Sequence, residues 1–273
     1  FNDSLAGVDI LYDVAFTIMD LGYRNLAQFA NLLMSRYFAY QRELGGVALM
    51  PLFLSCRAVV RAKVLAELAS IQNTRQSSTL VAASDYIQLA SRYLAPPTPR
   101  LVAIGSISGT GKSSVARALA PRIDRPPGAL VLRSDVQRKI MLGHSPMARL
   151  GTKDYAPEVS AKVYAELARR AGQALAAGFS VVVDAVHGRL EERDAIAEVA
   201  RNQGRRFDGF WLTAPQNLLA ERINGRNDDA SDATLAVLEQ QIKSDFRGGT
   251  WKVIDASMTT TDIVAEVQRQ LAH

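Results

Sequence analysis

The chain has 273 residues, of which 48% are hydrophobic and 22% are charged, and its formal net charge is +5 at pH 7. This composition is typical of a folded globular protein with room for two domains, and it excludes an intrinsically disordered chain. The modest charge, with no long run of Lys and Arg, argues against a nucleic-acid-binding arm and suits an anionic small molecule.

One cysteine and one short apolar run limit where the protein is expected to work. Cys56 is the only cysteine, so no disulfide can form within the chain, and a reducing cytoplasm is the expected location. The longest apolar run, from Gly45 to Cys56, is too short to span a bilayer and contains Pro51. We therefore expect a buried helix beginning near Pro51 and no membrane partner. The chain opens on Phe1 within what reads as a packed segment, so a missing N-terminal part of the same protein is also expected.

Residues 1–95 are predicted to form a mostly helical domain. Their apolar side chains recur at helical spacing, and no stretch alternates as a half-buried strand would. Examples are Val14, Ile18, Leu21, Leu26, Phe29, Leu33 and Phe38. The segment 96–100 carries three prolines, which end a helix and favour a stiff, extended linker.

Residues 101–273 are predicted to form an α/β domain. Short β-rich runs alternate with long amphipathic stretches such as 158–177 and 191–202. The predicted strands are 101–105, 129–133, 180–185, 207–212 and 251–255. Continuous apolar strands separated by helices imply a parallel, roughly five-stranded sheet with helices on both faces.

The segment SISGTGKS, from Ser106 to Ser113, follows the first predicted strand and opens a helical pattern. Gly111, Lys112 and Ser113 supply the end of the Walker A pattern. There the glycines turn backbone N–H groups inward, and the following helix points its positive end at a phosphate. The pattern has Gly at its first position, whereas this chain has Ser106; a glycine-rich turn without a ligand is the alternative. The residues predicted to hold ATP are Ser108, Gly109, Thr110, Gly111, Lys112, Ser113 and Ser114.

Asp135 follows the second predicted strand, in the segment LRSDVQRKIMLG. A carboxylate at the carboxyl end of a parallel strand can take the proton of an attacking hydroxyl. Arg133, Arg138 and Lys139 offer positive charge to an anionic acceptor, and Asp135 and Arg138 are the predicted acceptor-binding residues. In the alternative, Ser134 or Asp135 starts the next helix as its N-cap, a role that can coexist with catalysis.

Asp184 ends the hydrophobic run SVVVDA, an arrangement of the Walker B type. We expect Asp184 and the Ser113 hydroxyl to position Mg²⁺, with a turn-forming Asp184 as the alternative. His187 is assigned no role, because a lone loop histidine seldom has a catalytic one.

A polar loop beyond residue 220 carries Arg222 and Arg226. Such a loop can close over a triphosphate and bring a guanidinium to the transferred group. Solvated surface arginines are the alternative. Trp211 and Trp251 fall in predicted strands and are expected in the core.

From about residue 100 onward, these motifs together resemble the P-loop small-molecule kinases. Similar arrangements occur in gluconate kinase, adenylylsulfate kinase, chloramphenicol phosphotransferase, polynucleotide kinase and the zeta toxins. The resemblance rests on the Walker A segment, LRSDVxRK, VVVDA, an Arg-bearing loop and the final WxxIDAS. It implies that Lys112 contacts the phosphates, that Asp135 acts on the acceptor hydroxyl, and that Arg222 or Arg226 clamps the triphosphate.

Residues 7–38 resemble the helical C-terminal lobe of the aminoglycoside phosphotransferases. Asp9 and Asp13 match that family's GDPxxDLA segment, whereas its HxDxxxxN catalytic loop does not occur in this sequence. The resemblance implies a truncated lobe, without chemistry of its own, fused to a P-loop kinase.

The sequence therefore predicts an ATP- and Mg²⁺-dependent phosphotransferase acting on a hydroxyl of a small-molecule acceptor. A positive pocket favours an acceptor that carries a phosphate or a carboxylate. A toxin-like kinase acting on a nucleotide sugar would share this chemistry. The alternative from another class is an ATP-binding regulatory module with little or no transfer activity. The substitution of Ser106 for the Walker A glycine favours this alternative.

Overall fold

The computed structural model describes residues 9–71, 78–145, 148–224, 238–239, 241 and 250–272. The described helices of the first part are α1 (Ile10–Tyr23), α2 (Ala27–Ala39), the 3-10 turn η2 (Gly45–Leu49), α3 (Met50–Ile71) and α4 (Ser78–Tyr93). The strands of the second part are β1 (Arg100–Gly105), β2 (Leu130–Arg133), β3 (Val181–Asp184), β4 (Arg206–Thr213) and β5 (Lys252–Asp255). Its helices are α5 (Lys112–Leu119), η3 (Ala120–Arg122), α6 (Ser134–Met141), η4 (Thr152–Tyr155), α7 (Pro157–Ala176), α8 (Leu190–Arg201), α9 (Gln216–Asn224) and α11 (Thr260–Ala272).

The five strands form one parallel sheet in the order β2-β3-β1-β4-β5. Each lies where the apolar runs predicted it. The helix predicted near Pro51 begins at Met50, but it is not buried as expected, because one face of α3 is exposed. The fold is α/β, with a parallel sheet covered by helices, as the sequence predicts. In such a sheet, the carboxyl ends of the strands meet along one edge, where ligands bind.

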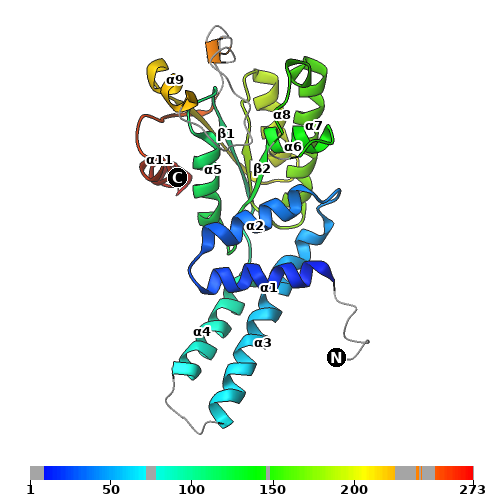
Figure 1. The fold of residues 1–273 in the computed structure, drawn as a ribbon, viewed down its shortest axis with the longest axis vertical. Helices are drawn as coiled ribbons and strands as arrows, with labels where there is room; N and C mark the ends of the chain where they lie inside the picture. The colour runs from blue at the N-terminus through cyan, green and yellow to red at the C-terminus, as the bar shows by residue number, and fades with distance from the viewer. Residues whose placement is uncertain are drawn as a thin grey trace.

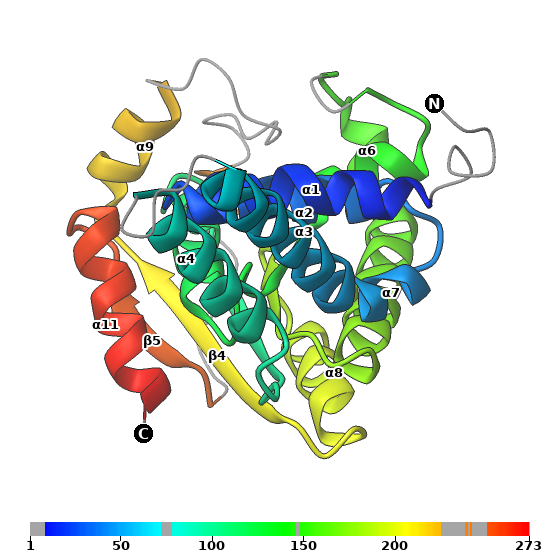
Figure 2. The same ribbon diagram turned by 90° about the horizontal axis from the view of Figure 1, so that it is seen from below.

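Alternate residues of the strands face the two covering layers, as strand geometry requires. Val102, Ile104, Val182 and Phe210 pack in a core with α5 and α11, and their neighbours in the strands face α7 and α8. Figure 1 shows α5 and α11 on one side of the sheet and α7 and α8 on the other, and Figure 2 shows the same layers from below. Burial of both faces explains why the strands read as continuous apolar runs.

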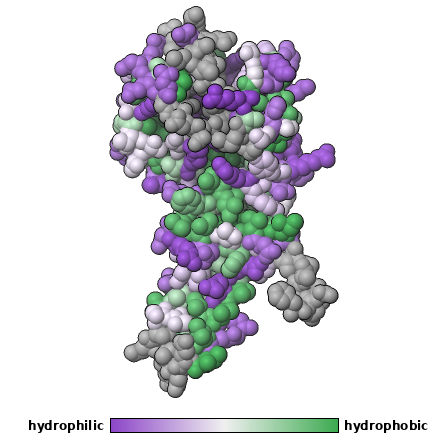
Figure 3. All heavy atoms as spheres, in the orientation of Figure 1, coloured by the Kyte–Doolittle hydropathy of each residue, from purple (hydrophilic) through white to green (hydrophobic). Residues whose placement is uncertain are grey.

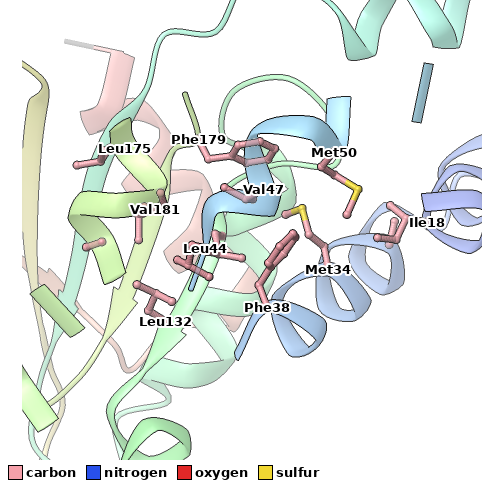
Figure 4. Close-up of a cluster of buried hydrophobic side chains, with 14 of the residues drawn as sticks. Ile18, Met34, Phe38, Leu44, Val47, Met50, Leu132, Leu175, Phe179 and Val181 are labelled. Atoms are coloured by element: carbon pink, nitrogen blue, oxygen red, sulfur yellow. The ribbon is translucent and has the colours of Figure 1, made fainter. Parts of the chain in front are cut away.

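The helical half packs against the β2 edge of the sheet and shares its core. Figure 4 shows side chains from both halves in one cluster, with Phe38 and Met50 near Leu132 and Phe179. The α3–α4 hairpin projects away from the sheet beyond α1 and α2 (Figure 1). Where α1 meets the hairpin, the rings of Tyr23 and Tyr86 stack with centroids 3.8 Å apart.

Polar contacts fix the same junction. Asn31 of α2 is 2% exposed, and its Nδ2 donates to the carbonyls of Pro127 and Ala129, at 3.0 and 2.8 Å. The Ser35 hydroxyl accepts from the Val131 backbone N–H at 3.1 Å. These bonds join α2 to edge strand β2 and to the segment just before it, so the helical half is attached to the α/β half by more than the linker.

Asn31→Ala is expected to lower the free energy of unfolding by about 2 kcal/mol, because two buried carbonyls lose their donor. Urea unfolding measures the change, and Gln28→Ala on the exposed face of α2 is the control. Equal stability of the two variants would show that the junction does not depend on these bonds.

Exposed apolar side chains are concentrated in the helical half. Figure 3 shows hydrophobic surface at the waist of the molecule and along the projecting hairpin. On α3 the exposed large hydrophobic residues are Leu52, Val59, Val60, Val64, Leu68 and Ile71. Within the described ranges, no helix combines the length and apolar character needed to cross a bilayer.

Candidate active site

The glycine-rich loop lies between the end of β1 and the start of α5, at the carboxyl edge of the sheet. Gly109 and Gly111 have φ values of +90° and +88°, in the left-handed region that residues with a Cβ rarely adopt. A Cβ at Gly109 would also lie 2.8 Å from the carbonyl oxygen of Leu219 in α9. Both glycines are therefore required by the path of the loop.

Ser106 takes the first position of the Walker A pattern without left-handed backbone geometry. Its side chain is buried, and Oγ donates to the Leu212 carbonyl at 2.8 Å, while its N–H donates to the Val186 carbonyl at 3.2 Å. The serine thus links the loop to β4 and to the segment after β3. The departure from glycine leaves the loop's fold intact.

Gly105, immediately before the loop, is packed between two indoles. A Cβ there would lie 2.7 Å from Trp251 Cζ3 and 3.0 Å from Trp211 Cε3. Both tryptophans are in the core, as predicted, so neither can move freely.

Gly105→Ala is expected to lower the free energy of unfolding by about 1–3 kcal/mol, as overpacking of a dense core does. Thermal unfolding checks it against Gly45→Ala, where no atom lies within 4 Å of the added Cβ. Equal melting temperatures would contradict the packing argument.

Donors in the loop already bind oxygen atoms. The Ser108 N–H donates to the Gln241 side-chain oxygen at 2.8 Å, and Lys112 Nζ donates to the Ile107 carbonyl at 3.3 Å. Thr110 Oγ1 donates to the same carbonyl at 3.0 Å, and Ser114 lies exposed in the first turn of α5. Gln241 is a contact that the motif did not reveal, because it comes from far along the chain. The hydrogen bond to the Gln241 oxygen shows that the Ser108 N–H points away from the backbone of the loop toward an acceptor.

Ser113, Asp184 and Arg133 form a closed triangle of hydrogen bonds. Ser113 Oγ donates to Asp184 Oδ2 at 2.6 Å, and Arg133 donates to Asp184 Oδ2 from Nε at 3.0 Å and to Ser113 Oγ from Nη2 at 2.9 Å. The strand register brings them together, because Asp184 in β3 pairs with Arg133 in β2 and with Ile104 in β1. Asp184 is therefore part of the Walker A–Walker B contact and not only a turn residue.

The Ser113 hydroxyl and the Asp184 carboxylate suit Mg²⁺, which prefers hard oxygen ligands and completes its shell with water and phosphate. Within the part of the chain that the structure describes, no group of three or more His, Cys, Asp or Glu side chains could hold a metal by itself.

Asp135 lies in the first turn of α6, beside this triangle. The helix begins at Ser134, as the alternative expected, but its N-cap position is Arg133, and no side chain makes a capping hydrogen bond. Neither Ser134 nor Asp135 is therefore the N-cap residue. Burial raises the pKa of the Asp135 carboxyl, and the nearby Asp184 carboxylate raises it further. Lys112, Arg133 and Arg138 act in the opposite direction on this pKa.

Arg138 is more deeply buried than expected for a residue that binds an acceptor at the surface of an open pocket. It is 5% exposed, and its guanidinium donates to the Asp154 carbonyl at 2.9 Å and to Ser160 Oγ at 3.3 Å. It also lies over the Tyr155 ring, 4.6 Å from the centroid. Arg138 therefore holds the η4 segment against α6, and its contact with an acceptor stays a prediction. Lys139 is likewise buried.

A buried cluster that the motifs did not indicate lies under the loop. His187 has a φ of +49°, its N–H donates to Tyr164 Oη at 3.0 Å, and its ring packs against Tyr164 and Trp251. Burial lowers the pKa of His187 to about 3, and the nearby Arg193 cation lowers it as well, so the imidazole is neutral at physiological pH. Arg193 donates to the His187 carbonyl and lies 4.3 Å from the Trp211 ring centroid.

The structure describes only one of the two arginines predicted in the loop that could close over a triphosphate. Arg222 Nη1 donates to the Ala256 carbonyl at 2.9 Å, which joins the end of α9 to the segment after β5. Arg222 is therefore not a solvated surface arginine. Arg226 lies outside the described residues, and its role stays a prediction.

Comparisons with known proteins show which sequences and structures this chain is similar to. The model of a family described as "AAA domain" matches residues 101–246. Three uncharacterised proteins, two from strains of Mycobacterium tuberculosis and one from Mycobacterium bovis, are 28% identical over 243 residues, 87% of this chain and 47% of theirs. The chain thus spans about half the length of the curated relatives it matches.

Solved structures with a similar arrangement include two named kinases. A gluconokinase from Sinorhizobium meliloti is 24% identical, with a TM-score of 0.46, over 64% of this chain and 93% of its own. An APS kinase from Mycobacterium tuberculosis is 21% identical, with a TM-score of 0.46, over 65% of this chain and 100% of its own.

Proposed function

Because this chain belongs to the AAA domain family, whose model covers more than half of it, we propose that it is an ATP-dependent phosphotransferase. The γ-phosphate would pass to a hydroxyl of a small-molecule acceptor. The observation that carries this proposal is the grouping of the loop donors, the Ser113–Asp184 pair and Asp135 at one edge of the sheet.

In the proposed reaction, the N–H groups of the loop and Lys112 bind the phosphate oxygens and offset their charge. Asp135 orients the acceptor hydroxyl and takes its proton as the oxygen forms a bond to the γ-phosphorus. The bond from that phosphorus to the β–γ bridging oxygen breaks, which leaves ADP and a phosphorylated acceptor. The neutral His187 is not suited to a cationic role.

Ser113 and Asp184 are the residues that would hold Mg²⁺. When bound, the cation offsets negative charge on the triphosphate. We propose Arg222 and Arg226 as the arginines nearest the transferred group, which Arg222 could reach only after releasing the Ala256 carbonyl. We propose an acceptor with a phosphate or carboxylate, which Arg138 could bind in exchange for its bonds to the Asp154 carbonyl and Ser160 Oγ.

The resemblance of residues 7–38 to the aminoglycoside phosphotransferase lobe stays a prediction, because the matched family covers residues 101–246. Asp9 accepts from the Leu11 N–H at the start of α1, and Asp13 pairs with Arg57 at 2.6 Å. The first contact caps α1, and the second joins α1 to α3.

A nucleotide titration with a turnover assay tests the proposed function. ATP binding is measured by calorimetry with and without Mg²⁺, and ADP formation is measured with and without pooled cell metabolites. A kinase gives ADP formation that the metabolites stimulate. Binding without stimulated turnover would favour the regulatory module instead.

Transfer activity is also expected to fall on acidification at a pH above the ordinary carboxyl range of about 4. Burial and Asp184 raise the pKa of Asp135, so the base is lost to protonation earlier than an exposed carboxylate would be. A pH profile of kcat/KM checks this expectation. An acid limb at or below the ordinary range would contradict the role of Asp135 as base.

A further inference from the structure

Arg133 binds the same two oxygen atoms that would hold Mg²⁺. Its Nε lies 3.0 Å from Asp184 Oδ2, and its Nη2 lies 2.9 Å from Ser113 Oγ. The proposed reaction gives this guanidinium no part. It nevertheless contacts both members of the metal-binding pair directly.

The backbone fixes this contact. Arg133 is the last residue of β2 and pairs in register with Asp184 at the end of β3. Ser113 is the second residue of α5, which the glycine-rich loop places over the same strand ends. The side chains of Arg133 and Asp184 are 12% and 4% exposed, so water screens their charges poorly.

Charge then decides what else can bind there. The Arg133 cation pairs with the Asp184 anion, and the Lys112 and Arg138 cations act on the neighbouring Asp135 carboxylate. A free divalent cation that approached Ser113 and Asp184 would meet a guanidinium already bonded to both, and like charges this close in a poorly screened site repel strongly. A triphosphate brings several negative charges and reverses that balance.

We propose that Arg133 excludes free divalent cations from the Ser113–Asp184 pair and admits one only together with a nucleoside triphosphate. Arg133 is thus a positioning and selecting residue, since it acts through Ser113 and Asp184. The proposal rests on the proposed function, because the triphosphate is the group that changes the charge of the site. The competing view is that Arg133 is a salt bridge of purely structural value.

Binding of Mn²⁺ to the full chain tests the proposal, with free Mn²⁺ followed by its electron paramagnetic resonance signal. Without nucleotide, Arg133→Gln is expected to bind Mn²⁺ at least about tenfold more tightly than the wild type, because a neutral amide replaces the competing cation. Arg133→Lys keeps the charge and is expected to bind as weakly as the wild type. With ATP present, the difference between wild type and Arg133→Gln is expected to shrink to about threefold or less.

A second substitution locates the effect. Adding Asp184→Asn to Arg133→Gln is expected to remove the gain in Mn²⁺ affinity, because the gain depends on the Asp184 carboxylate. Circular dichroism confirms that each variant is folded.

Three results would overturn the proposal. They are an Arg133→Gln variant that is folded but binds Mn²⁺ no more tightly, an equal gain in Arg133→Lys, and a gain that survives Asp184→Asn. If Arg133→Gln does not fold, Mn²⁺ binding to the wild type without nucleotide tests the proposal. Half-saturation below about 0.1 mM Mn²⁺ would show that Arg133 does not exclude free divalent cations. ATP binding by the wild type is measured in a separate titration. If ATP does not bind, the proposed function is refuted. If ATP binds but Arg133→Gln has the Mn²⁺ affinity of the wild type, only the role of Arg133 is refuted.

Discussion

Asp135→Asn is expected to lower kcat for phosphoryl transfer by about a thousandfold while leaving the Kd for ATP within about threefold of the wild type. Asparagine keeps the size of the side chain but cannot accept the proton of the acceptor hydroxyl. The carboxyl lies beside the Ser113–Asp184 pair and outside the loop proposed to bind phosphate, so nucleotide binding should persist.

Glu158→Gln, at an exposed position in the first turn of α7, is the matched control for neutralising a carboxylate. Stopped-flow or coupled assays give kcat, and calorimetry gives Kd. Wild-type turnover in Asp135→Asn would remove Asp135 from the role of base.

The same substitution is expected to stabilise the fold at neutral pH. Because the pKa of Asp135 is raised in the folded state, its ionised form costs stability above that pKa. As pH falls through the folded pKa, the folded state takes up the proton first and the cost disappears. Asp135→Asn should therefore melt at a higher temperature than the wild type at pH 7, and this advantage should shrink on acidification.

Lys112→Ala is expected to weaken ATP binding by about 10- to 100-fold, the scale of a lost hydrogen bond to a charged group. A larger fall of about 100- to 1000-fold is expected in kcat/KM, because the lysine also offsets charge on the transferred phosphate. Lys112 lies in the loop, where its Nζ donates to the Ile107 carbonyl and can turn to a phosphate oxygen.

Lys162→Ala removes an exposed lysine from α7 and controls for net charge. Calorimetric titration with Mg·ATP measures Kd for both variants. Unchanged affinity in Lys112→Ala would show that the loop does not bind the triphosphate through this residue.

Local pattern was enough to predict the elements and the loop. Apolar runs located all five strands, because a strand buried on both faces is continuous in sequence. The Walker A glycines were recognisable because their positive φ values require glycine. The Walker motifs also predicted that Ser113 and Asp184 serve one site, although their direct hydrogen bond appears only in the structure.

Contacts across long sequence separations could not be predicted in this way. The order of strands places Arg133 beside Asp184, and that order is not encoded in any one segment. From the sequence alone, Arg133 was expected to bind an acceptor, whereas in the structure it donates hydrogen bonds to Ser113 and Asp184. Likewise, nothing in the sequence around Asn31 indicates its bond to the Pro127 carbonyl. The bond between Gln241 and Ser108 also joins residues that are far apart in the chain.

The most direct test of phosphotransfer follows the γ-phosphate itself. The purified chain is incubated with Mg²⁺, pooled cell metabolites and ATP labelled with ¹⁸O in the γ-phosphate, and the products are identified by mass. We predict a labelled phosphometabolite with the wild type, and none with Lys112→Ala or Asp135→Asn. Label found only in ATP or inorganic phosphate, under conditions where ATP binds, would contradict the account of this protein as a kinase.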